Sequence, residues 1–156
     1  EMRGYIERVK EGEGLKLDDK VVEALIYVSE GDLRKLTNVL QSAAMQSTKI
    51  TEASIYDVAS RARPKEIVAM LKYALTGDFS KARDELDNLM LMSGMSAEDI
   101  ILQSYREVQN VNIDERAKLS VIKELGEANF RIVEGANERI QLEAMLAGLA
   151  LIKKTA

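Results

Sequence analysis

The sequence predicts an all-α protein. Only one proline and nine glycines interrupt its 156 residues. Apolar residues recur at spacings of three and four along most of the chain, and runs that alternate between apolar and polar residues are almost absent, which favours helices over strands. The 46% hydrophobic and 31% charged content is typical of a globular chain. The length allows one ordinary domain or two small ones.

The first half is predicted to form four short helices. They cover residues 2–11, 18–29, 33–47 and 51–60, with Asp18 and Thr51 at capping positions. Residues 15–17 and 49–51 are two brief extended segments that we expect to lie close enough to pair. Each is too short to be an independent strand.

A domain boundary is predicted at the segment Arg-Ala-Arg-Pro, residues 61–64. The single proline stands where one helix ends and the next begins at its first position. Its basic neighbours either contact DNA or complement the end of the preceding helix, and the second interpretation is favoured. The predicted domains are therefore 1–63 and 64–156.

The second half is more regular and predicts a compact bundle of five helices. These are expected at 64–75, 78–93, 97–109, 114–133 and 138–154. Two features allow a functional interpretation, but a structural one is favoured for each. Met90, Met92 and Met95 are expected in the core or a subunit contact, and the acidic residues at 84, 85 and 87 are expected on a solvated face.

Arg34 is the one residue that does not suit a plain structural helix. It falls in the first turn after Gly31 and Asp32, where a cation meets the positive end of the helix dipole. Because helix N-termini favour anions, an arginine beside one is suited to clamping a phosphate. On these residues alone a solvated arginine is the favoured interpretation.

Missing residue types and motifs exclude several functions. The chain has no Cys and no His, so it lacks thiolate chemistry and the commonest general base and metal ligand. It has neither a Gly-x-x-x-x-Gly-Lys-Ser/Thr phosphate loop nor a Gly-x-Gly-x-x-Gly motif. The net charge of −4 argues against a surface built wholly for nucleic acid, although a local basic patch stays open. We predict no catalytic residue and no metal site, in a soluble intracellular protein.

Three segments resemble the small subunit of replication factor C, the clamp loader, in its archaeal form. They are Glu-Gly-Asp-Leu-Arg at 30–34 with Asn-Val-Leu-Gln at 38–41, Val-Ala-Ser-Arg-Ala-Arg-Pro at 58–64, and Asn-Phe-Arg-Ile-Val-Glu-Gly-Ala-Asn-Glu at 129–138 followed by Gln-Leu-Glu-Ala at 141–144. The first is only moderately specific, but the three occur in the family's order. The resemblance extends over essentially the whole chain.

The resemblance implies the C-terminal part of an AAA+ ATPase, an interpretation that also suits a chain beginning with Glu inside a helical pattern. Residues 1–63 would be most of the helical lid and 64–156 the collar that joins subunits in a ring. Arg34 would be the sensor 2 arginine, which reaches the nucleotide γ-phosphate, supported by the helix start at Gly31 and Asp32. Candidates for subunit contact in the collar are Arg131, Glu138, Arg139, Leu142 and Met145.

The resemblance also implies what this chain lacks. The phosphate loop, the Mg²⁺-coordinating carboxylate and most contacts to the sliding clamp and primer-template DNA would lie in a missing N-terminal domain. The fragment would hold no cofactor and be inert alone, whereas the intact protein would use ATP and Mg²⁺. Its partners would be other clamp-loader subunits, in the cytoplasm of an archaeal cell at replication sites, with no membrane. The alternatives are a stand-alone helical adaptor or oligomerisation module, and the lid of another AAA+ protein.

Overall fold

A computed structural model describes residues 2–47 and 49–152 of the chain. The described residues form helices and no strand, so the all-α prediction is confirmed. The predicted pairing of the two extended segments is wrong, since their residues form no bridge. Helix bounds are α1 (Met2–Glu13), α2 (Asp19–Ser29), α3 (Leu33–Gln46), α4 (Glu52–Val58), α5 (Pro64–Leu75), α6 (Phe79–Asp87), η1 (Asn88–Met92), α7 (Ala97–Glu107), η2 (Val108–Asn110), α8 (Glu115–Val133) and α9 (Glu138–Ala150).

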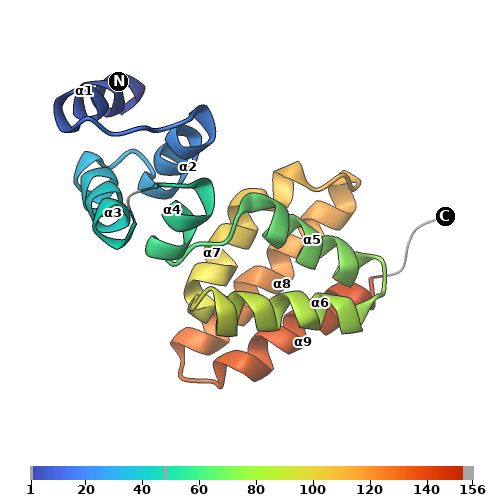
Figure 1. Ribbon diagram of the computed structural model, residues 1–156. Helices are drawn as coiled ribbons and strands as arrows, with labels where there is room; N and C mark the ends of the chain where they lie inside the picture. Colours follow the sequence, from blue (N-terminus) through green and yellow to red (C-terminus); the bar gives the residue numbers. More distant parts are fainter. Residues whose placement is uncertain (1, 48, 153–156) are drawn as a thin grey trace. The chain divides into compact units, whose positions relative to one another are not determined.

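Contacts within the chain divide it into two compact units, Glu1–Arg61 and Ala62–Ala156. The first unit holds α1 to α4 (Figure 1). Its core gathers apolar side chains from all four helices, among them Ile6, Leu25, Leu36 and Ile55, each fully buried. Helix α2 lies at the centre of this unit because it packs against the three others. None of the described helices is long and apolar enough to cross a membrane.

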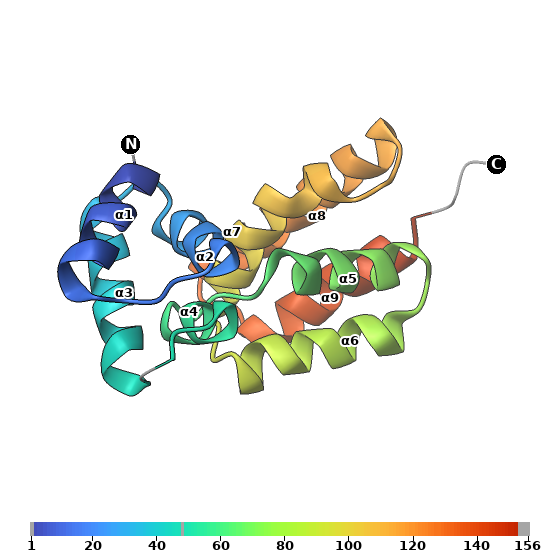
Figure 2. The same cartoon turned by 45° about the horizontal axis from the view of Figure 1, so that its top comes forward.

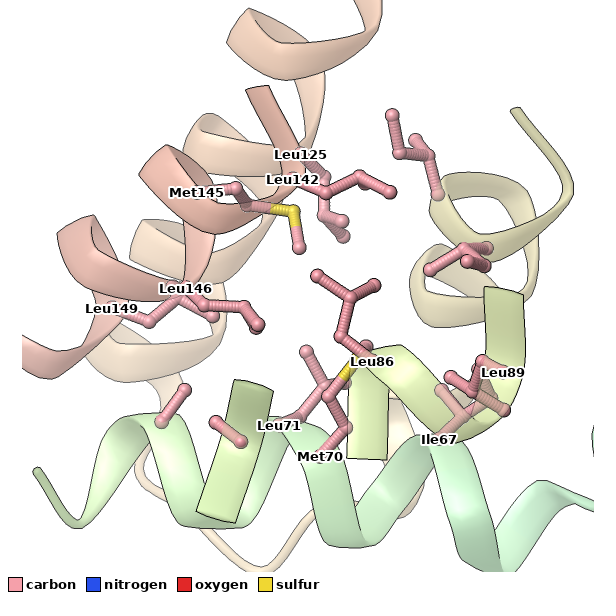
Figure 3. Packing of buried hydrophobic residues seen from close by; sticks show 14 of the residues in the cluster. Ile67, Met70, Leu71, Leu86, Leu89, Leu125, Leu142, Met145, Leu146 and Leu149 are labelled. Carbon is pink, nitrogen blue, oxygen red and sulfur yellow. The ribbon is translucent and has the colours of Figure 1, made fainter. Parts of the chain in front are cut away.

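The second unit holds α5 to α9, five helices as the sequence predicts, but α9 ends at Ala150 and not at the predicted residue 154. Residues 153 and 154 lie outside the described residues. Pro64 is the first residue of α5, as predicted, and the preceding Arg63 backbone amide donates to the Glu66 carboxylate at 3.0 Å. Helices α5 to α9 enclose one apolar interior. Figure 3 shows Leu86 of α6 and Leu142 of α9 pointing into it from opposite sides.

Helix α6 differs from the single helix predicted for 78–93. It ends at Asp87 and continues as the π-helical turn η1, in which the Ser93 amide donates to the Asn88 carbonyl at 3.1 Å. This turn keeps Leu89 buried but leaves Leu91 and Met92 exposed. A pattern of period 3.6 does not foresee a residue inserted into the helical ladder, which is why the sequence missed this feature.

Candidate functional site: the start of α3 and the end of the α8–α9 hairpin

The turn between α2 and α3 positions Arg34 through two left-handed residues and a helix cap. Glu30 has φ +55° and Gly31 has φ +89°, so two consecutive residues are left-handed. Asp32 follows as the N-cap of α3, and its carboxylate accepts the backbone N–H groups of Arg34 at 2.8 Å and Lys35 at 3.2 Å. The predicted helix start at Gly31 and Asp32 is where the structure has it.

The Arg34 side chain is exposed and has no ionic or hydrogen-bond partner within residues 2–47 and 49–152. Because Asp32 already occupies the first free backbone amides of α3, an anion at this end would meet the guanidinium rather than bare N–H groups. A guanidinium offers a planar fork of donors that suits phosphate oxygens. The exposed guanidinium is therefore available for contact with an anion, and its exposure fits equally the solvated arginine that these residues alone favour.

The α8–α9 hairpin turns through a glycine that its geometry requires. Helix α8 ends at Val133, and the Ala136 amide then donates to the Arg131 carbonyl at 2.9 Å while the Gly135 amide donates to the Ile132 carbonyl at 3.0 Å. This pair of bonds defines a Schellman motif, and Gly135 has the left-handed φ of +95° that the motif needs. The structure thus has a turn between the helices predicted to end at 133 and to begin at 138.

The charged interface candidates lie around this turn. Arg131 is exposed and pairs with the Glu127 carboxylate at 2.9 Å within α8. Glu138 is exposed as the first residue of α9. Arg139 is half-buried, and its guanidinium bridges the carboxylates of Asp87 and Glu143. This arginine thus joins α6 to α9.

The same contact changes the protonation of the acid. The hydrogen bond from Arg139 lowers the pKa of Asp87 from its ordinary value of 3.8, and the charges of Arg139 and Arg83 act in the same direction. Arg83 also reaches Glu143, with 3.2 Å between Nε and Oε1. Two arginines and two acids therefore form one network between α6 and α9, which the reading of residues 84, 85 and 87 as a solvated face did not foresee.

Leu142 and Met145, the two apolar interface candidates, are interior residues. They are 0% and 2% exposed, and Figure 3 shows both side chains pointing from α9 into the core. Neither presents a surface that a second chain can touch in this fold. We therefore assign both to packing of the second unit and drop them from the contact surface.

Apolar side chains that the sequence placed in the core, or did not single out, are exposed near the hairpin instead. They occupy the last turns of α8, the first turn of α9, and η1. Helix turn η1 belongs with the hairpin because it directly follows Asp87, which forms an ion pair with Arg139 of α9. Both ribbon views show this end of α6 beside the start of α9 (Figures 1 and 2). We call the set the hairpin-end surface: Leu91 (75% exposed), Met92 (83%), Phe130 (61%), Val133 (71%) and Ile140 (64%).

Sequence periodicity missed this surface for a physical reason. Val133 and Ile140 continue the apolar spacing of their helices, and that spacing is the same whether a residue faces a core or a partner. The three predicted methionines show the same ambiguity, since Met95 is 3% exposed and Met92 is 83% exposed. A cluster of exposed apolar residues is a stronger sign of an interaction surface than any single one.

Acidic residues do not converge on a metal position. Within the described part of the chain, no group of three or more acidic side chains is placed to hold a metal ion.

The chain is similar to known proteins over both of its units. The family model described as "Replication factor C C-terminal domain" matches residues 62–148. The chain is 52% identical over 145 residues to the replication factor C small subunit of Methanococcus maripaludis strain S2, covering 93% of this chain and 46% of that protein. It is 52% identical over 147 residues to the small subunit of Methanocaldococcus jannaschii (94% and 8% covered) and 48% identical over 149 residues to that of Thermococcus kodakarensis (96% and 17% covered).

The chain spans about half the length of the Methanococcus relatives that it matches. The matched relatives extend the similarity over α1 to α4, beyond the segment that the family model covers. Because that model alone matches more than half of the chain, the chain belongs to the replication factor C C-terminal domain family.

Proposed function

We propose that this chain is the C-terminal part of a clamp-loader small subunit that acts in DNA replication. The first unit serves as the lid of an AAA+ ATPase and the second as the collar that joins subunits. The observation that carries the proposal is the exposed, unpaired Arg34 after the Gly31–Asp32 turn, in a chain about half identical to replication factor C small subunits.

In the first unit, Arg34 contacts the γ-phosphate of a nucleotide that is held mainly by the ATPase domain of the intact subunit. ATP has this phosphate and ADP lacks it, so the contact favours one lid orientation only when ATP is bound. A ligand shifts a conformational equilibrium only through such differential contact. The intact subunit accordingly hydrolyses ATP with Mg²⁺, whereas this fragment has no ATPase activity by itself.

In the second unit, the hairpin-end surface contacts neighbouring clamp-loader subunits. Its five exposed apolar residues occur on the same helix ends as the exposed charged residues Arg131 and Glu138, and protein interfaces combine an apolar core with a polar rim. The partners are other copies of the small subunit and the large subunit. The sliding clamp and primer-template DNA are contacted mainly through the ATPase domain, in the cytoplasm at replication sites.

The test of nucleotide sensing uses the intact subunit with Arg34→Ala. We expect affinity for a non-hydrolysable ATP analogue to fall about tenfold, the value of one hydrogen bond to a charged group, with ADP affinity unchanged. Arg8→Ala is the matched control, because Arg8 is also exposed in the first unit with no partner among the described residues. Equal losses for the ATP analogue and ADP, or no loss for either, would contradict the sensing role.

A further inference from the structure

We infer that Glu30 is a positioning residue for Arg34. Its carboxylate ties the start of α3 to Arg61, the last residue of the first unit, and so fixes the backbone from which the Arg34 side chain extends. This inference rests on the proposed nucleotide contact of Arg34 and names a residue that tunes it.

Glu30 forms two ion pairs, one with the start of α3 and one with the residue that ends the first unit. Its Oε2 lies 3.4 Å from Nζ of Lys35, in the first turn of α3, and its Oε1 lies 3.4 Å from Nη2 of Arg61. The Arg61 side chain is only 12% exposed, against 30% for Glu30. Solvent therefore screens this pair less than it screens an ordinary surface pair.

Backbone strain occurs at both ends of the Glu30–Arg61 pair. Among the described residues, Glu30 (φ +55°) and Ser60 (φ +50°) are the two non-glycine residues with positive φ. Ser60 immediately precedes Arg61 and closes α4, where the Arg61 amide donates to the Tyr56 carbonyl at 3.0 Å. A residue with a Cβ keeps this conformation only where its surroundings enforce it, and here each strained residue is or adjoins a partner in one ion pair.

Glu30 precedes Arg34 by one short turn, so its ion pairs affect the backbone that carries Arg34. The neighbouring Gly31 has no Cβ to restrict it, so the turn between α2 and α3 would otherwise be free to reorient. Because Lys35 and Arg61 hold the Glu30 carboxylate, the backbone that leads from Glu30 to Arg34 starts from a fixed point. A fixed start reduces the conformational freedom that Arg34 must lose when it contacts a phosphate.

The test measures the affinity of the intact subunit for a non-hydrolysable ATP analogue and for ADP, and takes their ratio. We expect Glu30→Gln to lower this preference for ATP about threefold, on the scale of a single ion pair. Arg61→Gln should lower it equally, Arg61→Lys should retain most of it, and the double variant Glu30→Gln/Arg61→Gln should lose no more than either single variant. Glu23→Gln is the control, because Glu23 is an exposed acid of α2 with a long, 4.0 Å pair to Arg3.

The ratio separates positioning from plain stabilisation. A residue that only stabilises the first unit changes its melting temperature without changing the preference for ATP over ADP. A wild-type ratio in Glu30→Gln, or additive losses in the double variant, would overturn the inference while leaving the sensing role of Arg34 intact. If Arg34→Ala in the same series kept the wild-type ratio, the proposed function itself would fail, and this inference with it.

Discussion

The two units of this chain differ in whether their arginine side chains are paired with carboxylates. In the second unit, Arg83 and Arg139 are both committed to carboxylates that link α6 with α9. In the first unit, Arg34 has no such partner among the described residues. Two other cations of this unit, Lys35 and Arg61, are instead both paired with Glu30.

The apolar side chains show the opposite contrast. The hairpin-end surface leaves five large apolar residues exposed on the second unit, whereas Leu33 and Met45 are the exposed large apolar residues among those described in the first unit. The first unit thus presents an unpaired arginine at the start of α3, and the second presents an apolar surface beside a network of ion pairs. An unpaired charge suits a ligand that comes and goes, and an apolar surface suits lasting association.

The largest expected effect concerns the core of the second unit. Leu142→Ala removes a fully buried side chain, and we expect the free energy of unfolding of this unit to fall by about 2–5 kcal/mol. Amide hydrogen exchange, read residue by residue, should show faster opening of α5 to α9 and unchanged protection in α1 to α4.

Leu119→Ala is the matched control for this prediction. Leu119 lies on α8 in the same unit, outside the hairpin-end surface, and is 60% exposed, so its loss should change the stability by less than about 0.5 kcal/mol. Equal effects of the two substitutions would contradict the assignment of Leu142 to the core. Loss of protection in both units would contradict the expectation that the first unit keeps its protection when the second opens.

A smaller effect is expected at the start of α3, where a structural residue and a proposed functional one are neighbours. Asp32→Ala removes the acceptor of two backbone N–H groups and should destabilise the first unit by about 1 kcal/mol. Arg34→Ala should change its stability by less than about 0.5 kcal/mol, because the side chain is exposed. Thermal melting of the two variants checks the pair, and a large loss for Arg34→Ala would mean that this arginine is structural.

The smallest effect is the pH dependence of the α6–α9 network. The hydrogen bond from Arg139 lowers the folded-state pKa of Asp87 below 3.8. The stability from this contact is therefore fully present above about pH 4 and is lost as the pH falls through the folded-state pKa. In Arg139→Gln the pKa of Asp87 should rise toward 3.8, as followed by NMR titration of the Asp87 carboxyl carbon, and an unchanged titration would show that the contact is absent in solution.

Most of the fold could be predicted because local signals agree with the tertiary structure. The caps Asp18 and Thr51, and Pro64 at the first position of α5, all mark helix starts that the structure has. Each acts through its own backbone or a few neighbouring residues, so the sequence alone contains the necessary information. Errors concentrate where the chain departs from regular geometry, as at the π-helical turn that begins at Asn88.

The candidate site was predictable only in part, because some of its features depend on contacts between residues far apart in the sequence. Arg34 is conspicuous because its position in a helix is visible in the sequence, but its lack of a partner is not. The bridge from Glu30 to Arg61 joins residues 31 positions apart, and no local pattern encodes such a contact. The exposure of Val133 and Ile140 was likewise hidden, since it depends on how α8 and α9 turn at Gly135 rather than on their spacing.

The central claim is that the second unit assembles subunits through an apolar surface separate from its core. The most direct test is the absolute mass of this chain in solution, by light scattering over a concentration series, beside the variant Val133→Ser/Ile140→Ser. We predict a defined oligomer for the wild type and a monomer with unchanged helix content for the variant, because both side chains are exposed in the isolated fold. A wild-type chain that stays monomeric at every concentration, or a variant that keeps the wild-type mass, would contradict the claim.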